Sequence, residues 1–269
     1  MSTTYGLHRA LLLNCDKTVF LFGDRSRTWA EVADRVARLA GALKDLGVGK
    51  GDRVAVLMLN QDRYLELYLG TAWAGAAIVP LNIRWSAIEN EDALRDCRPQ
   101  ILIADSTFAP MSVELARKVG AIRLAYADDV GADLPASTLN YEQLISTASP
   151  VPDAEAGDGD LAGIFYTDGT TGRSKGVMLS HRNLMGNSRN MLAERLTHEP
   201  PSAASASRPT NARAASISAT TCCRCPAPGK SLNASCARRS GEAKRARSTE
   251  KDRGRKYVVG FCRSGADRL

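Results

Sequence analysis

The sequence predicts an α/β fold over residues 1–198, with helices layered against a sheet, and a disordered basic tail over residues 199–269. Three observations predict this division. Helix-like and strand-like hydrophobic patterns alternate up to about residue 198, as they do in α/β proteins. Beyond that point both periodicities stop and the chain becomes rich in Ser, Ala and Arg. With 269 residues in total, the patterned part is long enough to bury a sizeable core.

The first predicted helix begins at Thr28, because Thr28 and Glu31 have the spacing of a capping box. Apolar residues then recur on one helical face until Gly47 ends the helix. A buried strand over 52–58 follows. The next predicted elements are a helix over 61–74, a strand over 77–81, a helix over 86–97, a strand over 101–104, a helix near 112–119 and a strand near 121–125.

The last part of the patterned region surrounds a Gly/Thr-rich loop. Residues 148–160 contain two prolines, two glycines and several acidic residues, which predicts a surface loop. The segments 161–166 and 177–179 predict two strands, and 181–196 predicts an amphipathic helix. We expect His181, at the start of this helix, to lie on the surface, with contact to a ligand as the alternative.

The charge is divided unevenly along the chain. Residues 199–269 hold 15 Lys or Arg against 5 Asp or Glu, whereas residues 1–198 hold 21 against 24. The formal charge of +7 therefore comes from the tail. Because no aromatic residues are interleaved with the basic clusters, we predict a solvated tail and no dedicated nucleic-acid partner. Non-specific binding to nucleic acid or to an acidic surface through Arg238–Arg239 and Lys244–Arg247 is the alternative.

No segment predicts a membrane span, because the longest apolar stretch, residues 71–81, is too short and contains proline. The apolar run at residues 10–13 is followed by polar and charged residues, so it does not predict a signal peptide. Of seven cysteines, only Cys15 and Cys97 lie in the patterned part, which favours the reducing cytoplasm.

The tail holds few large apolar residues, too few to offset an ordering cost of about 1–2 kcal/mol per residue. A short strand at 256–259 is the one exception that we expect. Cys222 and Cys225 have the spacing of a zinc-ligand pair, but no second pair accompanies them, so no metal site is predicted. Periodicity and apolar content are lost together, which indicates a reading-frame shift near residues 198–201.

Residues 166–176 read Tyr-Thr-Asp-Gly-Thr-Thr-Gly-Arg-Ser-Lys-Gly and carry the clearest chemical signal in the chain. The glycines allow tight turns whose N–H groups can surround an anion, and the threonines add hydroxyl donors. Lys175 can neutralise part of a phosphate charge. The run is not a Walker A motif, and a plain hairpin loop is the alternative to a polyphosphate site.

This run resembles the phosphate-binding signature of the AMP-forming acyl-CoA synthetases, [YF]-T-S-G-T-T-G-x-P-K-G. The segments 22–31, 46–55 and 79–82 are also similar to that family. The resemblance covers residues 1–198 and implies the N-terminal portion of an adenylate-forming enzyme. Two residues depart from the signature: Asp168 replaces a serine and Ser174 replaces a proline.

The resemblance implies an acid–thiol ligase that uses ATP, Mg²⁺ and coenzyme A. A carboxylate would attack the α-phosphorus of ATP and release pyrophosphate, and the thiol of coenzyme A would then displace AMP. No catalytic residue is assigned. The residues that the resemblance places around the phosphates are Thr167, Asp168, Gly169, Thr170, Thr171, Gly172 and Lys175.

The family's aromatic-Gly-x-Thr-Glu motif, its ribose-binding aspartate and its C-terminal catalytic lysine have no counterpart in the sequence. The resemblance therefore implies a truncated ligase for fatty acids or other carboxylic acids that is inactive as this chain. Two alternatives remain open: a small nucleotide-binding protein and a basic-tailed interaction protein.

Overall fold

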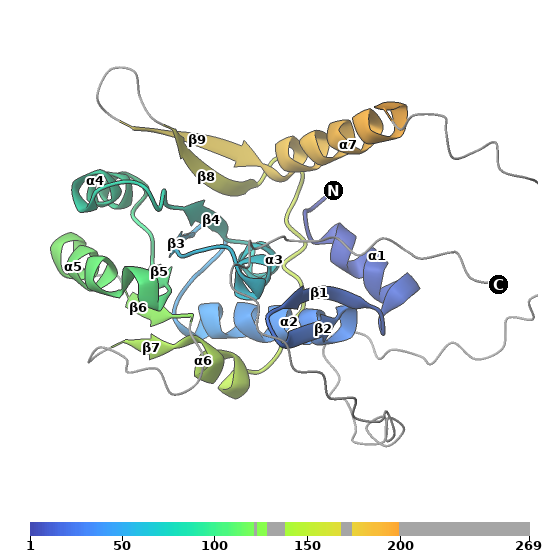
Figure 1. The fold of residues 1–269 in the computed structure, drawn as a ribbon, viewed down its shortest axis with the longest axis horizontal. Coiled ribbons are helices and arrows are strands. Elements are labelled where there is room, and N and C mark those ends of the chain that lie inside the picture. Colours follow the sequence, from blue (N-terminus) through green and yellow to red (C-terminus); the bar gives the residue numbers. More distant parts are fainter. Residues whose placement is uncertain (121–122, 128–137, 168–173, 199–269) are drawn as a thin grey trace, which may run out of the picture.

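A seven-stranded, mostly parallel sheet with helices on both faces organises the chain in the computed structural model (Figure 1). The structure describes residues 1–120, 123–127, 138–167 and 174–198. The strand order is β7-β6-β5-β3-β4-β8-β9, and β9 alone runs antiparallel to its neighbour. A separate antiparallel pair, β1 with β2, lies beside the helices of one face. These features confirm the predicted layered α/β fold.

The elements of the described residues have the following bounds. The strands are β1 Thr18–Phe22, β2 Arg25–Thr28, β3 Arg53–Leu57, β4 Ala77–Pro80, β5 Ile101–Ala104, β6 Arg123–Tyr126, β7 Leu139–Asn140, β8 Leu161–Thr167 and β9 Lys175–Ser180. The helices are α1 Tyr5–Asn14, α2 Trp29–Asp45, α3 Asp62–Trp73, α4 Ala87–Cys97, α5 Ala109–Val119, α6 Tyr141–Thr147 and α7 His181–His198, with a 3₁₀ turn over Ser106–Phe108.

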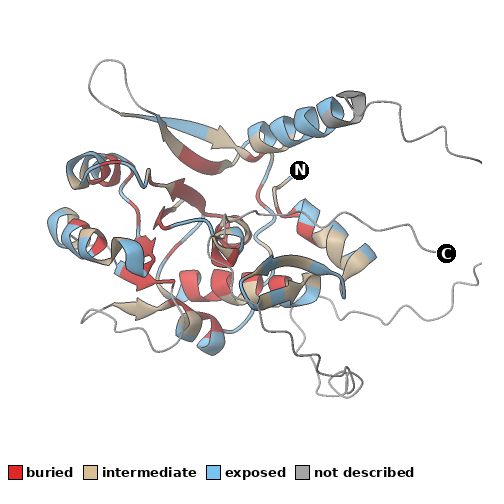
Figure 2. Ribbon diagram, viewed as in Figure 1, coloured by how far each residue is buried: buried red, intermediate tan, exposed pale blue. Residues whose placement is uncertain are grey.

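The alternation of side chains along the central strands divides the core into two layers. In β3, Val54 and Val56 belong to a cluster with side chains of α1, α2, α3 and α6. Ala55 and Leu57 belong to the opposite cluster, with side chains of α4 and α5. Because both faces are covered, the strands are apolar throughout, and Figure 2 shows them buried between helices with exposed outer surfaces.

The predicted elements from Thr28 to β6 and the strands β8 and β9 are present, with bounds shifted by a few residues. The capping box of α2 is confirmed. Glu31 N–H donates to Thr28 Oγ1 at 3.3 Å, and Thr28 N–H donates to Glu31 Oε2 at 2.7 Å. The sequence analysis missed α1, the β1–β2 hairpin, β7 and α6. The predicted strand at 256–259 and the rest of the tail lie outside the described residues.

The segment 148–160 is a surface loop without helix or strand, as its composition predicts, and hydrogen bonds attach it to two helices. Val151 N–H donates to the Ala37 carbonyl at 3.1 Å, and Ala154 N–H donates to the Trp73 carbonyl at 2.9 Å. The buried Trp73 indole in turn donates to the Val151 carbonyl at 2.9 Å. These hydrogen bonds hold the segment against α2 and α3.

The helix predicted over 181–196 is present as α7, but few of its side chains are buried. Of its described side chains only His181 is buried, and the side chains of Met191 and Leu192 are exposed. The apolar side of the predicted amphipathic helix therefore lacks a covering surface among the described residues. No helix in the described ranges has the length and apolar content needed to cross a membrane.

Candidate functional site

The β8–β9 hairpin presents the two ends of the Gly/Thr-rich run. Thr167, the last residue of β8, pairs with Lys175, the first residue of β9. Both are exposed, and within the described residues the Lys175 ammonium has no carboxylate partner. The other predicted phosphate-binding residues, Asp168, Gly169, Thr170, Thr171 and Gly172, lie outside the described residues. A hydroxyl and a cation are thus held opposite each other where the motif begins and ends.

Tyr166 anchors the hairpin next to this end. Its hydroxyl donates to Asp96 Oδ2 at 2.5 Å and lies 3.2 Å from the Ala93 carbonyl, both in α4. Burial and the hydrogen bond to the Asp96 carboxylate raise the pKa of Tyr166, so the phenol remains a donor. Burial likewise raises the pKa of Cys97 to about 11, so its thiol is not a ready nucleophile.

Glycine is required where β8 meets the central sheet. The register between β8 and β4 contains one residue pair, Ile78 with Gly163. A Cβ atom at Gly163 would lie 2.8 Å from the Ile78 carbonyl oxygen, closer than real Cβ contacts allow. The close approach of the two backbones is therefore possible only with glycine, and it fixes where the hairpin leaves the sheet.

His181 is buried, with a relative exposure of 1%, so the expectation of a surface residue is wrong. Its Nδ1 accepts a hydrogen bond from Thr3 N–H at 3.3 Å and lies 3.1 Å from Thr3 Oγ1. The N-terminal segment covers the imidazole, and a contact 178 residues apart in sequence cannot be predicted from the local pattern. Burial lowers the pKa of His181.

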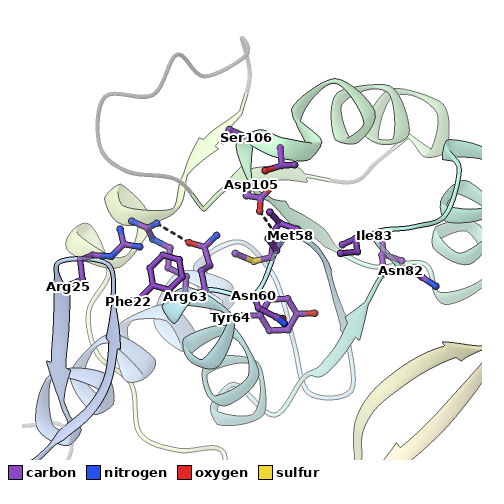
Figure 3. A pocket seen from close by; sticks show the side chains of 14 residues that line it. Phe22, Arg25, Met58, Asn60, Arg63, Tyr64, Asn82, Ile83, Asp105 and Ser106 are labelled. Atoms are coloured by element: carbon purple, nitrogen blue, oxygen red, sulfur yellow. Dashed lines mark hydrogen bonds between the residues drawn. The ribbon is translucent and has the colours of Figure 1, made fainter. Parts of the chain in front are cut away.

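A cleft of about 650 Å³ opens at the carboxyl ends of β3, β4 and β5 (Figure 3). After β3 the chain turns to α3 on one face of the sheet, whereas after β4 and β5 it turns to α4 and α5 on the other. Ligands of open α/β sheets bind where the connections diverge in this way. The lining residues include Phe22, Arg25, Asn60, Tyr64, Asn82 and Asp105.

Asp105 is a buried carboxylate in the lining of the cleft. Its side chain is buried, and its Oδ2 accepts a hydrogen bond from Leu59 N–H at 2.7 Å. Its Oδ1 has no hydrogen-bond partner among the described residues. On the opposite wall Arg25 donates to Asp62 Oδ1 at 2.8 Å and lies over the Phe22 ring. The cleft therefore combines an apolar floor with polar groups held by neighbouring elements.

The sequence analysis did not find this cleft. The available signal was a polar residue shortly after each buried strand, namely Asn60 after β3, Asn82 after β4 and Asp105 after β5. Since β8 runs parallel to β4, Thr167 at its carboxyl end lies at the same edge of the sheet as these residues. The structure thus places the described ends of the motif and the cleft on one edge.

The described residues contain no group of three or more His, Cys, Asp or Glu side chains arranged to hold a metal ion. At nucleotide sites Mg²⁺ is held by one or two carboxylates together with phosphate oxygens and waters, so such a group is not required for the Mg²⁺ that the family resemblance implies. We assign no step to a metal. Thr167 and Lys175, in contrast, suit the phosphates of ATP because they offer a hydroxyl and a positive charge.

The profile of the AMP-binding enzyme family matches residues 7–210, which is more than half of the chain. The chain belongs to this family. The predicted resemblance is thereby confirmed.

The curated relatives that the chain matches are longer than the chain itself. A feruloyl-CoA synthase of Amycolatopsis is 38% identical over 181 residues, which cover 66% of this chain and 33% of that protein. A long-chain-fatty-acid–CoA ligase of Mycobacterium tuberculosis is 36% identical over 161 residues, covering 60% of this chain and 31% of that one. The chain thus spans about a third of the length of the curated relatives that it matches.

Solved family structures share this fold. The anthranilate CoA ligase in complex with anthranoyl-AMP aligns with a TM-score of 0.63 at 26% identity, over 68% of this chain and 35% of that one. ATP-bound MatB from Rhodopseudomonas palustris aligns with a TM-score of 0.60 at 31% identity, over 72% of this chain and 38% of that one. The described residues therefore form the N-terminal portion of an adenylate-forming enzyme.

Proposed function

We propose that the chain is the N-terminal part of a ligase that joins a carboxylic acid to coenzyme A, and that it holds ATP phosphates at the end of the β8–β9 hairpin. The pairing of Thr167 with Lys175 at the ends of the Gly/Thr-rich run carries this proposal. Lys175 would offset negative charge on the β- and γ-phosphates, and the threonines and loop N–H groups would donate to their oxygens. ATP-bound MatB supports ATP as the ligand.

In the complete reaction a carboxylate oxygen attacks the α-phosphorus of ATP, pyrophosphate leaves, and an acyl-adenylate forms. The thiol sulfur of coenzyme A then attacks the acyl carbon, loses its proton to solvent or a base, and AMP leaves. In this scheme the hairpin stabilises charge on the departing pyrophosphate by position and electrostatics. Thr167 and Lys175 bind and orient phosphate and transfer no proton.

Asp168 opposes this role. A carboxylate about 4 Å from a phosphate oxygen raises the energy by roughly 4 kcal/mol at an effective dielectric constant of 20, before screening. A repulsion of even about 2.8 kcal/mol weakens binding on the order of a hundredfold. We therefore propose that the chain binds ATP weakly and that, as a separate polypeptide, it does not complete adenylation.

ATP–pyrophosphate exchange tests the proposal that the chain does not complete adenylation. The purified chain is incubated with ATP, labelled pyrophosphate and a panel of acids that includes ferulate, benzoate, butyrate and a long-chain fatty acid. We expect exchange no faster than without acid, whereas a full-length AMP-forming ligase assayed in parallel exchanges readily. Acid-dependent exchange by the chain that is lost in Lys175→Ala would show an active enzyme and overturn the proposed inactivity.

We also propose that residues 1–198 and 199–269 are separate in origin, the second part being read out of frame, and that the protein is cytoplasmic. The abrupt change in composition near residue 199 supports the first point, and the scarcity of cysteine before it supports the second. Sequencing the DNA across codons 195–205 tests the frame. If neither alternative frame encodes a patterned α/β continuation, the frameshift proposal fails.

A further inference from the structure

The first residues of the chain lie against the base of the β8–β9 hairpin. Figure 1 shows the N-terminus beside the start of α7. Thr3 N–H donates to His181 Nδ1 at 3.3 Å, and Thr3 Oγ1 lies 3.1 Å from the same nitrogen. The N-terminal ammonium forms an ion pair with Asp158 in the segment that leads to β8. Two distant parts of the chain are thus joined at one point.

The hydrogen bond from Thr3 fixes the form of the imidazole. A backbone N–H can donate to Nδ1 only if that nitrogen carries no proton, so the bound form is neutral with its proton on Nε2. His181 Nε2 is buried and has no hydrogen-bond partner among the described residues. Because the ring is also buried, its charged form is disfavoured.

Besides this base, the hairpin is attached to the sheet through β4 and to α4 through the Tyr166 hydroxyl. One residue pair, Ile78 with Gly163, forms its register with β4, and the strand β9 pairs with β8 alone within the described residues. At its base His181 N–H donates to the Asp160 carbonyl at 3.1 Å, and Arg182 N–H donates to the Asp158 carbonyl at 2.9 Å. The base and the Tyr166 contact with α4 therefore restrain the hairpin from its two ends.

We propose that His181 is a positioning residue whose imidazole binds Thr3 and thereby fixes the base of the β8–β9 hairpin against the N-terminal segment. The six residues of β9 extend about 20 Å from this base. Without the contact at His181, the part of β9 between this base and the Tyr166 anchor is less restrained, and Lys175 lies at its far end. The consequence for phosphate binding rests on the function proposed above, whereas the restraint on the hairpin does not.

Protonation of His181 releases this restraint. The charged groups around it are the carboxylates of Asp160 and Asp153, which favour protonation, and the N-terminal ammonium, which opposes it. Asp160 is paired with Lys50, Asp153 with His8, and Asp158 with the ammonium and Arg182. Burial dominates and lowers the pKa of His181 below its ordinary value of 6.5. The restraint is therefore complete above about pH 6.5 and is lost as the pH falls through the lowered pKa.

Hydrogen exchange on the full chain tests the proposal. Protection factors, which remove the intrinsic pH dependence of exchange, are measured from pH 7.5 downward through 5.5 for amides of β9 and, as an internal reference, of α4. His181→Leu removes the acceptor, and His181→Asn keeps an acceptor near the position of Nδ1 without a titrating ring. We expect His181→Leu to lower β9 protection about tenfold at pH 7.5, with α4 unchanged and His181→Asn near wild type.

The pH dependence of β9 protection distinguishes a positioning role of the His181 hydrogen bond from a role of the ring in packing. As the pH is lowered in steps from 7.5 through 5.5 until His181 is protonated, the wild-type β9 amides are expected to lose several-fold more protection than those of His181→Asn. Equal losses in the two proteins, or unchanged β9 protection in a folded His181→Leu, would overturn the proposal. If His181→Leu does not fold, Thr3→Val, which removes only the hydroxyl, is expected to lower β9 protection about threefold, and no change would overturn it. ATP binding is measured in a separate assay. Failure to bind ATP would contradict the proposed function but not the positioning role of His181.

Discussion

Glu66→Ala is expected to lower the melting temperature by roughly 10 °C or more. The Glu66 carboxylate is completely buried, and Arg35 donates to both of its oxygens, at 2.7 and 2.9 Å. Tyr141 OH donates to it at 3.1 Å, and Arg27 lies 3.4 Å away. Burial raises the pKa of Tyr141 well above its ordinary value, and the Glu66 charge raises it further, so this donor stays protonated.

The size of the effect follows from removing the buried anion that partly buried Arg35 and Arg27 share, although Arg35 keeps its pair with Glu142. Breaking a buried ion pair on one side costs about 3–5 kcal/mol, and 1 kcal/mol shifts the melting temperature by about 2–4 °C in a domain of this size. Glu114→Ala is the matched control, because Glu114 pairs with Lys118 on the exposed face of α5. Differential scanning calorimetry of both variants makes the comparison. A Glu66→Ala protein that melts as Glu114→Ala does would show that the buried network is not a main support of the fold.

Gly41→Ala is expected to lower the free energy of unfolding by about 3 kcal/mol. Gly41 lies in α2 beneath the segment 148–160, and a Cβ atom there would lie 2.2 Å from the Ser149 carbonyl oxygen. That oxygen belongs to the backbone, and the hydrogen bond from Val151 to Ala37 holds the segment in place. The clash therefore cannot be relieved by a side-chain rotation, and the whole segment must move.

Gly6→Ala is the matched control for this substitution. Gly6 is also helical, in α1, but a Cβ atom there would have no neighbour within 4 Å. Because alanine is the better helix former, Gly6→Ala is expected to increase stability by about 0.5–1 kcal/mol. Urea denaturation of the two variants measures the difference. If Gly41→Ala were as stable as Gly6→Ala, residues 148–160 would not lie on α2.

The elements that the sequence analysis found are those whose signals are local. The capping box of α2 is read from Thr28 and Glu31, and β5 is an apolar run of the length and position predicted. The missed strand β2 reads Arg-Ser-Arg-Thr and has no strand-like apolar alternation. Its arginines instead reach Asp62 and Glu66 in α3, so tertiary ion pairs explain a segment that local propensity does not predict.

Of the candidate site, the Gly/Thr-rich run could be predicted from the sequence, whereas the cleft and the burial of His181 could not. The Gly/Thr-rich run identifies the family because its composition and order are unusual within eleven residues. The cleft beside it is assembled from residues that follow three strands, so it depends on the strand order. The burial of His181 depends on Thr3, near the opposite end of the sequence, and a single local pattern cannot show such a contact.

The affinity for ATP tests most directly whether the hairpin end is a phosphate site. Equilibrium dialysis with labelled ATP compares the wild-type chain with Lys175→Ala and Asp168→Ser. Lys44→Ala and Asp24→Ser, each at an exposed residue, are the two controls. We expect Asp168→Ser to bind on the order of a hundredfold more tightly than wild type and Lys175→Ala about tenfold more weakly, with both controls unchanged. Equal affinity in all five proteins would contradict a phosphate site at Thr167 and Lys175.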